Sequence, residues 1–173
     1  EEILAGLEAV HDAIGQALGH WPDRKIPVVL MNEADFYRAT GSFHWVGGVY
    51  DGQIKIPLKT DDALVGAERD TFTRTFRHEY THVIVKALWP GCPNWLNEGI
   101  AQYFELDDSR IAGERAASER RARVSRELKA IAKRIPIEKI PGRMWEISDA
   151  AFARQTYLEG LGFVMFLVEK HRA

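Results

Sequence analysis

The residues best suited to chemistry are two histidines and a glutamate in the segment His78-Glu79-Tyr80-Thr81-His82. Residues four apart on an α-helix lie one above the other, so His78 and His82 can bind one metal ion together. Glu79 directly follows the first histidine, an offset that keeps its carboxylate off the metal but within reach of a metal-bound water. The pattern predicts that Glu79 accepts a proton from that water, and therefore a hydrolytic metal site.

A helix has to carry these three side chains, and the flanking sequence predicts one from Phe72 to Leu88. Apolar residues recur along this run at helical spacing, and Trp89-Pro90-Gly91 follows it with residues that end helices. The alternative is a buried helix in which hydrogen bonds alone satisfy both histidines. The motif by itself does not separate the two interpretations.

A third ligand is needed, because catalytic zinc commonly takes three protein ligands and leaves one position for water. A second helix is predicted to begin near Pro93 and Asn94. Glu98 on this helix is the predicted third ligand, since fifteen residues separate it from His82, enough for a tight turn and an antiparallel return. Glu105 lies seven residues further along the chain and is predicted to accept a hydrogen bond from a ligating imidazole. An ordinary helix-surface acid is the alternative for each glutamate.

A β-hairpin is predicted upstream of the motif, with two extended pieces between Phe43 and Pro57 joined at Asp51-Gly52. Pro57 cannot donate a ladder hydrogen bond, which favours an edge strand. An edge strand beside a metal site offers free backbone groups to an extended peptide, and the residues predicted to do so are Gly48, Val49 and Tyr50. A hairpin that only completes a sheet is the alternative.

Other segments are predicted to supply the framework. Apolar spacing and breakers predict a first helix over residues 3–18, a buried strand over 26–31, a short helix over 32–39 ended by Thr40-Gly41, an amphipathic helix over 113–134 ended by Pro136, and a mostly buried last helix over 150–173 that contains Phe163 and Phe166. His11 is interpreted as a surface or capping residue, and His44 lacks a partner at ligand spacing.

Composition excludes several classes of protein. The chain has 173 residues, 46% of them hydrophobic, which predicts a single domain over 1–173. A formal charge of −2 gives no support for a nucleic-acid or anionic-membrane partner, and no apolar run reaches the length of a membrane span. The one cysteine, Cys92, cannot form an internal disulfide and is interpreted as a turn residue.

The chain opens without a methionine, which suggests a domain excised from a longer protein with flanking domains. No residue fixes the compartment, and we lean to a bacterial extracytoplasmic one.

The motif and the segment Trp95-Leu96-Asn97-Glu98-Gly99-Ile100-Ala101 together resemble the gluzincin metallopeptidases, the thermolysin-like clan that includes the zinc aminopeptidases. The compact form is most similar to the bacterial peptidase MA-like domains, over nearly the whole chain. The resemblance implies an α+β zincin fold in which a small twisted sheet with an edge hairpin packs on a helical half carrying the motif. It also implies one zinc ion on His78, His82 and Glu98, with Glu79 as general base.

The resemblance extends to Tyr157-Leu158-Glu159-Gly160, which is similar to the Tyr-x-x-Gly of the zinc aminopeptidases, where the tyrosine hydroxyl supports the oxyanion. Without the family, Tyr157 would be interpreted as a core aromatic residue. The sequence departs from the motifs of two related groups of zinc peptidases. The segment Gly47–Asp51 does not match the amine-binding Gly-x-Met-x-Asn of the aminopeptidases, and Val85 and Leu88 stand where metzincins have a glycine and a third histidine.

The predicted function is therefore zinc-dependent hydrolysis of peptide bonds in a peptide or protein substrate. A non-catalytic module that binds a peptide or partner chain on a degenerate peptidase fold is the alternative from another class. A purely structural zinc would need a fourth protein ligand, and Cys92 is the candidate for it.

Overall fold

The structure is a computed structural model that describes residues 2–58, 66–106, 114–142, 144 and 147–171. By its internal contacts the chain forms two compact units, Glu1–Gly91 and Cys92–Ala173. The prediction of a single domain over 1–173 stays a prediction.

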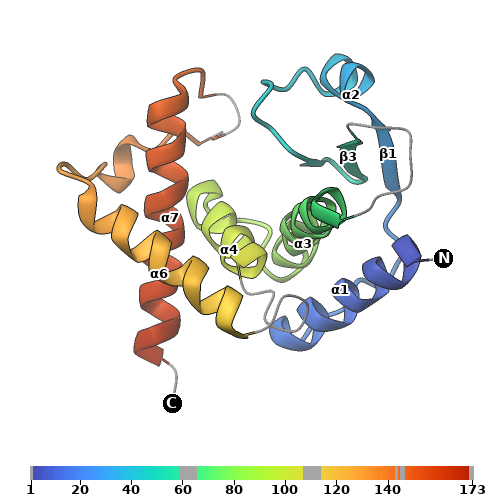
Figure 1. Cartoon of the computed structure of the whole chain (residues 1–173), viewed down its shortest axis with the longest axis horizontal. Coiled ribbons are helices and arrows are strands. Elements are labelled where there is room, and N and C mark those ends of the chain that lie inside the picture. Colours follow the sequence, from blue (N-terminus) through green and yellow to red (C-terminus); the bar gives the residue numbers. More distant parts are fainter. Residues whose placement is uncertain (1, 59–65, 107–113, 143, 145–146, 172–173) are drawn as a thin grey trace. The chain divides into compact units, whose positions relative to one another are not determined.

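In its described residues, the first unit combines a small sheet with the helices α1, α2 and α3 (Figure 1). Its elements are α1 (Glu2–Leu18), β1 (Val28–Asn32), α2 (Glu33–Thr40), β2 (Val49–Tyr50), β3 (Ile54–Leu58) and α3 (Gly66–Leu88). The strands lie in the order β1-β3-β2, with β1 parallel and β2 antiparallel to β3. Helix α3 packs against α1 and against β2 and β3, and its buried residues include Phe72, Phe76 and Ile84. The helix that carries the predicted motif is thus held by its own unit.

Local chemistry explains where α2 begins and ends and where the chain turns between β2 and β3. The Asn32 side chain accepts a hydrogen bond from the Asp35 backbone N–H and caps the start of α2. Gly41 ends α2 in the left-handed conformation that glycine adopts without steric cost. Gly52, with φ +111°, provides the turn between β2 and β3. The predicted first helix, short second helix and hairpin turn are confirmed.

Two predictions about the hairpin are wrong. The first extended piece is only two residues long, because Phe43 to Val46 form a turn closed by the Val46 N–H bonding to the Phe43 carbonyl. The strand that holds Pro57 lies in the middle of the described sheet. Pro57 is tolerated there because β2 pairs only with Ile54 and Lys55. The Ile54 N–H donates a hydrogen bond to the Pro27 carbonyl oxygen, on the β1 side of β3. Backbone N–H groups alternate between the two sides of a strand, so the nitrogen of Pro57, three residues further on, faces the other side, beyond the end of β2.

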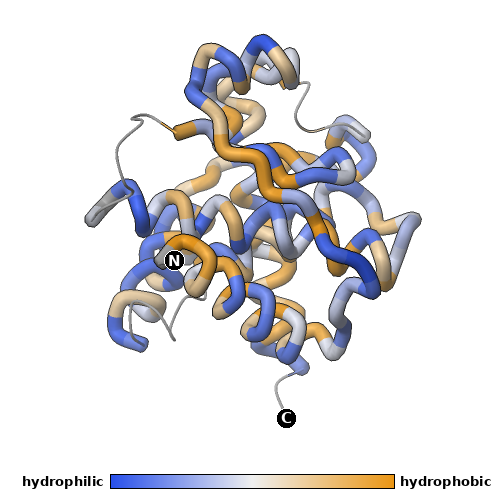
Figure 2. Tube along the Cα trace, turned by 90° about the vertical axis from the view of Figure 1, so that its right-hand side faces the viewer, coloured by the Kyte–Doolittle hydropathy of each residue, from blue (hydrophilic) through white to orange (hydrophobic). Residues whose placement is uncertain are grey.

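The second unit is helical in its described residues, with α4 (Asn94–Leu106), α6 (Glu114–Ala130), the short 3-10 helix η1 (Ile137–Lys139) and α7 (Ala150–His171). Helix α7 packs against both α4 and α6 (Figure 1). Asp149 caps α7 by accepting hydrogen bonds from the Ala151 and Phe152 backbone N–H groups, as its position predicts. Hydrophilic and hydrophobic residues are interspersed along the helical coils drawn in Figure 2, a pattern typical of amphipathic helices.

Helices α4 and α7 approach each other closely at two glycines. A Cβ atom added to Gly99 would lie 2.5 Å from the Gly160 carbonyl oxygen, and one added to Gly160 would lie 2.7 Å from the Trp95 carbonyl oxygen. These distances are shorter than any side chain allows, so glycine at both positions lets the two backbones touch. The contact fixes α4, including Glu98 next to Gly99, against α7.

Several expectations for the second unit and its boundaries need correction or lie outside the described residues. The last helix is less buried than predicted, since Phe163 is 39% and Phe166 55% exposed. The amphipathic helix ends at Ala130, earlier than Pro136. Its predicted start at residue 113, the loop at 59–65, part of the connection at 143–146 and the end at 172–173 lie outside the described residues.

The fold class agrees with α+β at the level of helices plus a three-stranded sheet among the described residues. The motif helix α3 packs on the sheet and belongs to the same unit, and the thermolysin-like arrangement stays a prediction. In the described part of the chain, every helix is too short or too polar to cross a bilayer.

Candidate metal centre

His78 and His82 lie one turn apart on α3, as their spacing predicts. Their ring centroids are 4.8 Å apart and the ring planes are nearly perpendicular, at 84°. Both side chains are half-buried, so they lie neither deep in the core nor fully in solvent. The rest of this stretch of α3 is buried, including Tyr80, Thr81 and Val83. The core face of the helix therefore fixes the backbone from which the two imidazoles project.

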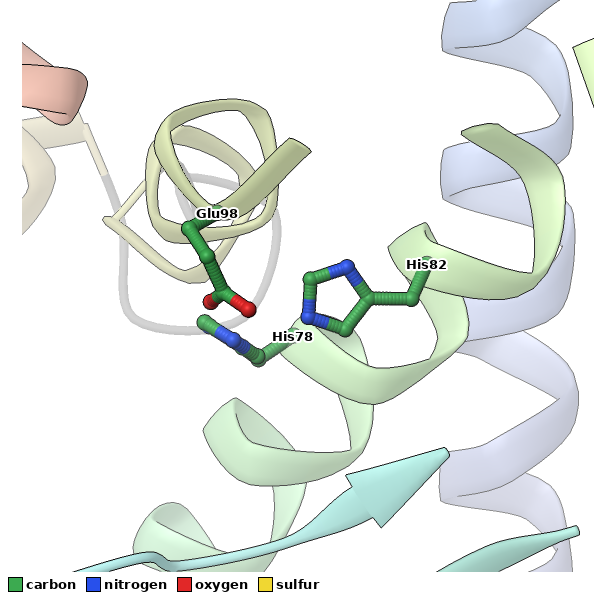
Figure 3. A group of neighbouring side chains, drawn as sticks. All are labelled: His78, His82 and Glu98. Atoms are coloured by element: carbon green, nitrogen blue, oxygen red, sulfur yellow. The ribbon is translucent and has the colours of Figure 1, made fainter. Parts of the chain in front are cut away.

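Glu98 completes a group of three possible metal ligands with these histidines. It sits on α4 and is only 7% exposed. Each of the three residues offers one ligand atom, and these atoms all lie within 4.8 Å of one another. Figure 3 shows the two imidazole rings and the carboxylate directed toward one another. The predicted ligands His78, His82 and Glu98 are brought together.

The donor set fits a divalent cation such as zinc. Ligand atoms about 2.0–2.2 Å from one ion lie about 3.4 Å apart in a tetrahedral site, which is within the limit that the group satisfies. Two neutral imidazoles and one carboxylate are the ligand types of catalytic zinc sites, which keep one position open. A buried carboxylate is costly unless charge or hydrogen bonds compensate it, and a bound cation at Glu98 would do so.

Glu79 is buried, at 5% exposed, on the helix that carries both histidines. The backbone of Gly48 lies directly against its side chain, since a Cβ atom at residue 48 would be 2.9 Å from Glu79 Oε1. Two residues further on, the Tyr50 ring lies under the side-chain ammonium of Lys86, a residue of α3, and the Lys86 Nζ atom is 5.6 Å from the ring centroid. These contacts show that the segment from Gly48 to Tyr50 runs along α3 beside Glu79. Strand β2, Val49–Tyr50, is at the edge of the described sheet, and the role of Gly48, Val49 and Tyr50 toward a substrate stays a prediction.

Tyr80 lies inside the motif and connects α3 to α1. Its hydroxyl and His11 Nδ1 share a hydrogen bond of 2.6 Å, and the two rings meet edge to face. Burial, and to a lesser degree the charge of Asp12, raises the pKa of Tyr80 to about 12. His11 is therefore a half-buried residue in mid-helix and not the surface or capping residue expected from the sequence.

Tyr157 and Glu105, the two remaining site predictions, have roles that stay predictions. Tyr157 lies on α7 and packs, partly buried, against the apolar cluster of Met144, Ile147 and Ala153. Glu105 is half-buried near the end of α4.

Cys92 and His44 do not belong to the group of three ligands found among the described residues. The Cys92 thiol instead contacts the Pro93 carbonyl oxygen at 3.7 Å, and burial raises the pKa of the thiol. The exposed His44 ring packs edge to face on Tyr37.

The sequence did not reveal the contact between Gly48 and Glu79 or the bond between His11 and Tyr80. A pair of adjacent glycines beside an apolar strand is the one local signal for the first contact, since glycine inside a strand pattern often marks a close backbone approach. The second pair is 69 residues apart, and no spacing rule reaches that far.

Comparisons of the chain with protein-family models, with curated proteins and with solved structures find no match.

Proposed function

We propose that this protein is a metal-dependent hydrolase of peptide bonds, with zinc as the metal and a thermolysin-like arrangement of the site. The observation that carries the proposal is the group of His78, His82 and Glu98 with Glu79 buried one residue from the first ligand. Two imidazoles and a carboxylate leave room for solvent on the metal, whereas a structural site would be closed by four protein ligands.

A bound zinc ion would supply Lewis acidity, which polarises a carbonyl group and lowers the pKa of a coordinated water. The protein residues have separate tasks. Glu79 accepts a proton from the attacking water at a carboxylate oxygen and delivers it to the leaving amine. Tyr157 donates its hydroxyl proton in a hydrogen bond to the oxygen that gains negative charge. Glu105 orients a ligating imidazole by accepting a hydrogen bond from its second ring N–H group.

The peptide class of substrate is supported by the edge strand. The segment Gly48-Val49-Tyr50 follows α3 beside Glu79, and β2 has a strand partner on one side only in the described sheet. An extended peptide can pair with such an edge through its backbone, which would bring its amide bonds alongside the general base.

Replacing Glu79 by glutamine tests the general base. The amide cannot accept the proton, so we expect turnover of a peptide library to fall about 10²-fold or more while zinc content stays at one ion per chain. Elemental analysis and peptide-cleavage assays on the same preparation give both quantities. Unchanged turnover would remove Glu79 from its role.

Replacing His78 by alanine tests the metal site, with His44→Ala as the matched control. Both variants lose one imidazole, but His44 is exposed and outside the ligand group. We expect zinc to be lost from the His78→Ala protein and retained in the control. Equal zinc content in the two variants would contradict the site. Full zinc occupancy of the wild type without cleavage of any peptide would favour the binding module over the hydrolase.

A further inference from the structure

We infer that Gly48 is a positioning residue for Glu79, because the Glu79 side chain lies in the space that a side chain at residue 48 would occupy. The inference rests on the proposed function for its consequence in catalysis, but the contact itself is a property of the first unit. It assigns to Gly48 a task that is separate from pairing with a substrate backbone.

The space at residue 48 is filled by α3 from two successive turns. A Cβ atom built on Gly48 would lie 2.9 Å from both Cγ and Oε1 of Glu79 and 2.8 Å from Cγ2 of Thr75. Thr75 and Glu79 are four residues apart and so share one face of the helix. A methyl group at this position would press on both side chains at once.

Neither neighbour can move away cheaply. Glu79 is 5% exposed, so the atoms packed around it restrict where its carboxylate can move. Thr75 is β-branched, and few side-chain rotamers are open to such a residue on a helix. A side chain at residue 48 would therefore push the Glu79 carboxylate from its place or push the strand segment off the helix.

The need for glycine at residue 48 is steric and not conformational. The glycines with positive φ are Gly19, Gly41, Gly52 and Gly66, and Gly48 is not among them. Alanine could adopt its backbone conformation without strain. The preceding residue, Gly47, also lacks a positive φ, and a Cβ atom there would meet only Thr75 Oγ1, at 3.8 Å, an ordinary contact. The two adjacent glycines thus form a matched pair that differs in contact with Glu79.

Comparison of Gly48→Ala with Gly47→Ala tests the role in turnover. Both changes remove the same amount of backbone freedom from the unfolded chain. We expect Gly48→Ala to keep its zinc, since neither the histidines nor Glu98 are touched, and to lose about tenfold or more in kcat with little change in KM, as a displaced general base requires. Gly47→Ala should stay within about twofold of wild type. Equal kcat in the two variants would overturn the inference, and so would a loss seen only in KM.

A stability cycle tests the contact without reference to activity or metal. Gly48→Ala should lower the melting temperature of the metal-free wild type by several degrees and lower that of a Glu79→Ala background by clearly less, because removing the glutamate side chain leaves room for the methyl group. Equal shifts in both backgrounds would overturn the inference. If Gly48→Ala does not fold, Thr75→Ala is added to relieve the second contact, and the same cycle is measured in that background.

The two experiments distinguish a failure of the proposed function from a failure of the positioning role of Gly48. A wild-type protein that binds zinc but cleaves no peptide overturns the proposed function, and the stability cycle then decides the positioning of Glu79 by itself. Active wild type with no coupling between residues 48 and 79 overturns the positioning role and leaves the proposed function standing.

Discussion

Glu79 and Glu98 are both buried carboxylates, at 5% and 7% exposed, yet their surroundings suit them to different tasks. Glu98 has its ligand atom within 4.8 Å of two imidazole nitrogens, where a cation would bind. Glu79 lies against the backbone at Gly48. At the scale of single residues, burial restricts both side chains, and a restricted carboxylate loses little conformational entropy when it acts.

Tyr157→Phe tests the proposed oxyanion donor while preserving packing. The variant retains the ring that packs near Met144, Ile147 and Ala153 and loses only the hydroxyl group. We expect kcat to fall about 10²-fold, as when one oxyanion donor is removed from a hydrolase, with zinc content and melting temperature close to wild type. Unchanged kcat would leave Tyr157 as the core aromatic residue that its contacts already support.

Tyr80 predicts a loss of stability at high pH. Its pKa is raised from 10.0 to about 12 in the folded protein, mainly by burial. Between these values the unfolded state gives up a proton that the folded state keeps, so stability is complete below pH 10 and falls as the pH rises through about 12. Chemical denaturation along this pH range measures the loss, and tyrosinate absorbance identifies the group.

Tyr80→Phe is the control for that pH dependence. The variant should lack the part of the alkaline loss that Tyr80 causes. At neutral pH it should be less stable by about 1 kcal/mol, the usual value of a single hydrogen bond, because His11 loses its 2.6 Å partner. An unchanged alkaline profile would assign the loss to other groups.

At the scale of elements, helix α4 depends on its glycine contact with α7. Gly99→Ala places a methyl group 2.5 Å from the Gly160 carbonyl oxygen, a backbone atom that cannot rotate away. We expect a loss of about 1–3 kcal/mol in the free energy of unfolding, typical of overpacking. Urea denaturation measures it, and loss of zinc affinity should accompany it because Glu98 is the adjacent residue.

Gly6→Ala provides the matched control, since it is the same substitution in helix α1 with no atom within 4 Å of the added Cβ. Alanine is the better helix former, so we expect this variant to gain up to about 1 kcal/mol. Opposite signs for the two substitutions would show that contact, and not helix propensity, decides the result. A gain in both would contradict the close approach of α4 and α7.

At the scale of the whole molecule, metal binding should stabilise the folded chain. An ion that binds the folded state and not the unfolded state adds about 2.7 kcal/mol when its concentration is a hundred times its dissociation constant. Zinc should therefore raise the melting temperature of the wild type, and a chelator should reverse the rise. The Glu98→Gln protein should respond to zinc much less, because the amide lacks the charge of the carboxylate ligand. An equal response would contradict a three-ligand site.

The sequence by itself determined the features that depend on residues a few positions apart. The spacing of His78 and His82 on one helix and the helix end at Gly41 were predicted and are confirmed, and the Asn32 and Asp149 caps are local features of the same kind. Each of these depends on hydrogen bonds or side-chain positions within about one or two helical turns, which the order of residues alone specifies.

Only the tertiary structure decided which distant segments meet. It placed the backbone of Gly48 against Glu79, the strand holding Pro57 in the middle of the described sheet, and Phe163 at the surface. These outcomes depend on strand pairing and packing between residues tens of positions apart, where many arrangements satisfy the same local pattern and the balance of burial and backbone pairing selects one.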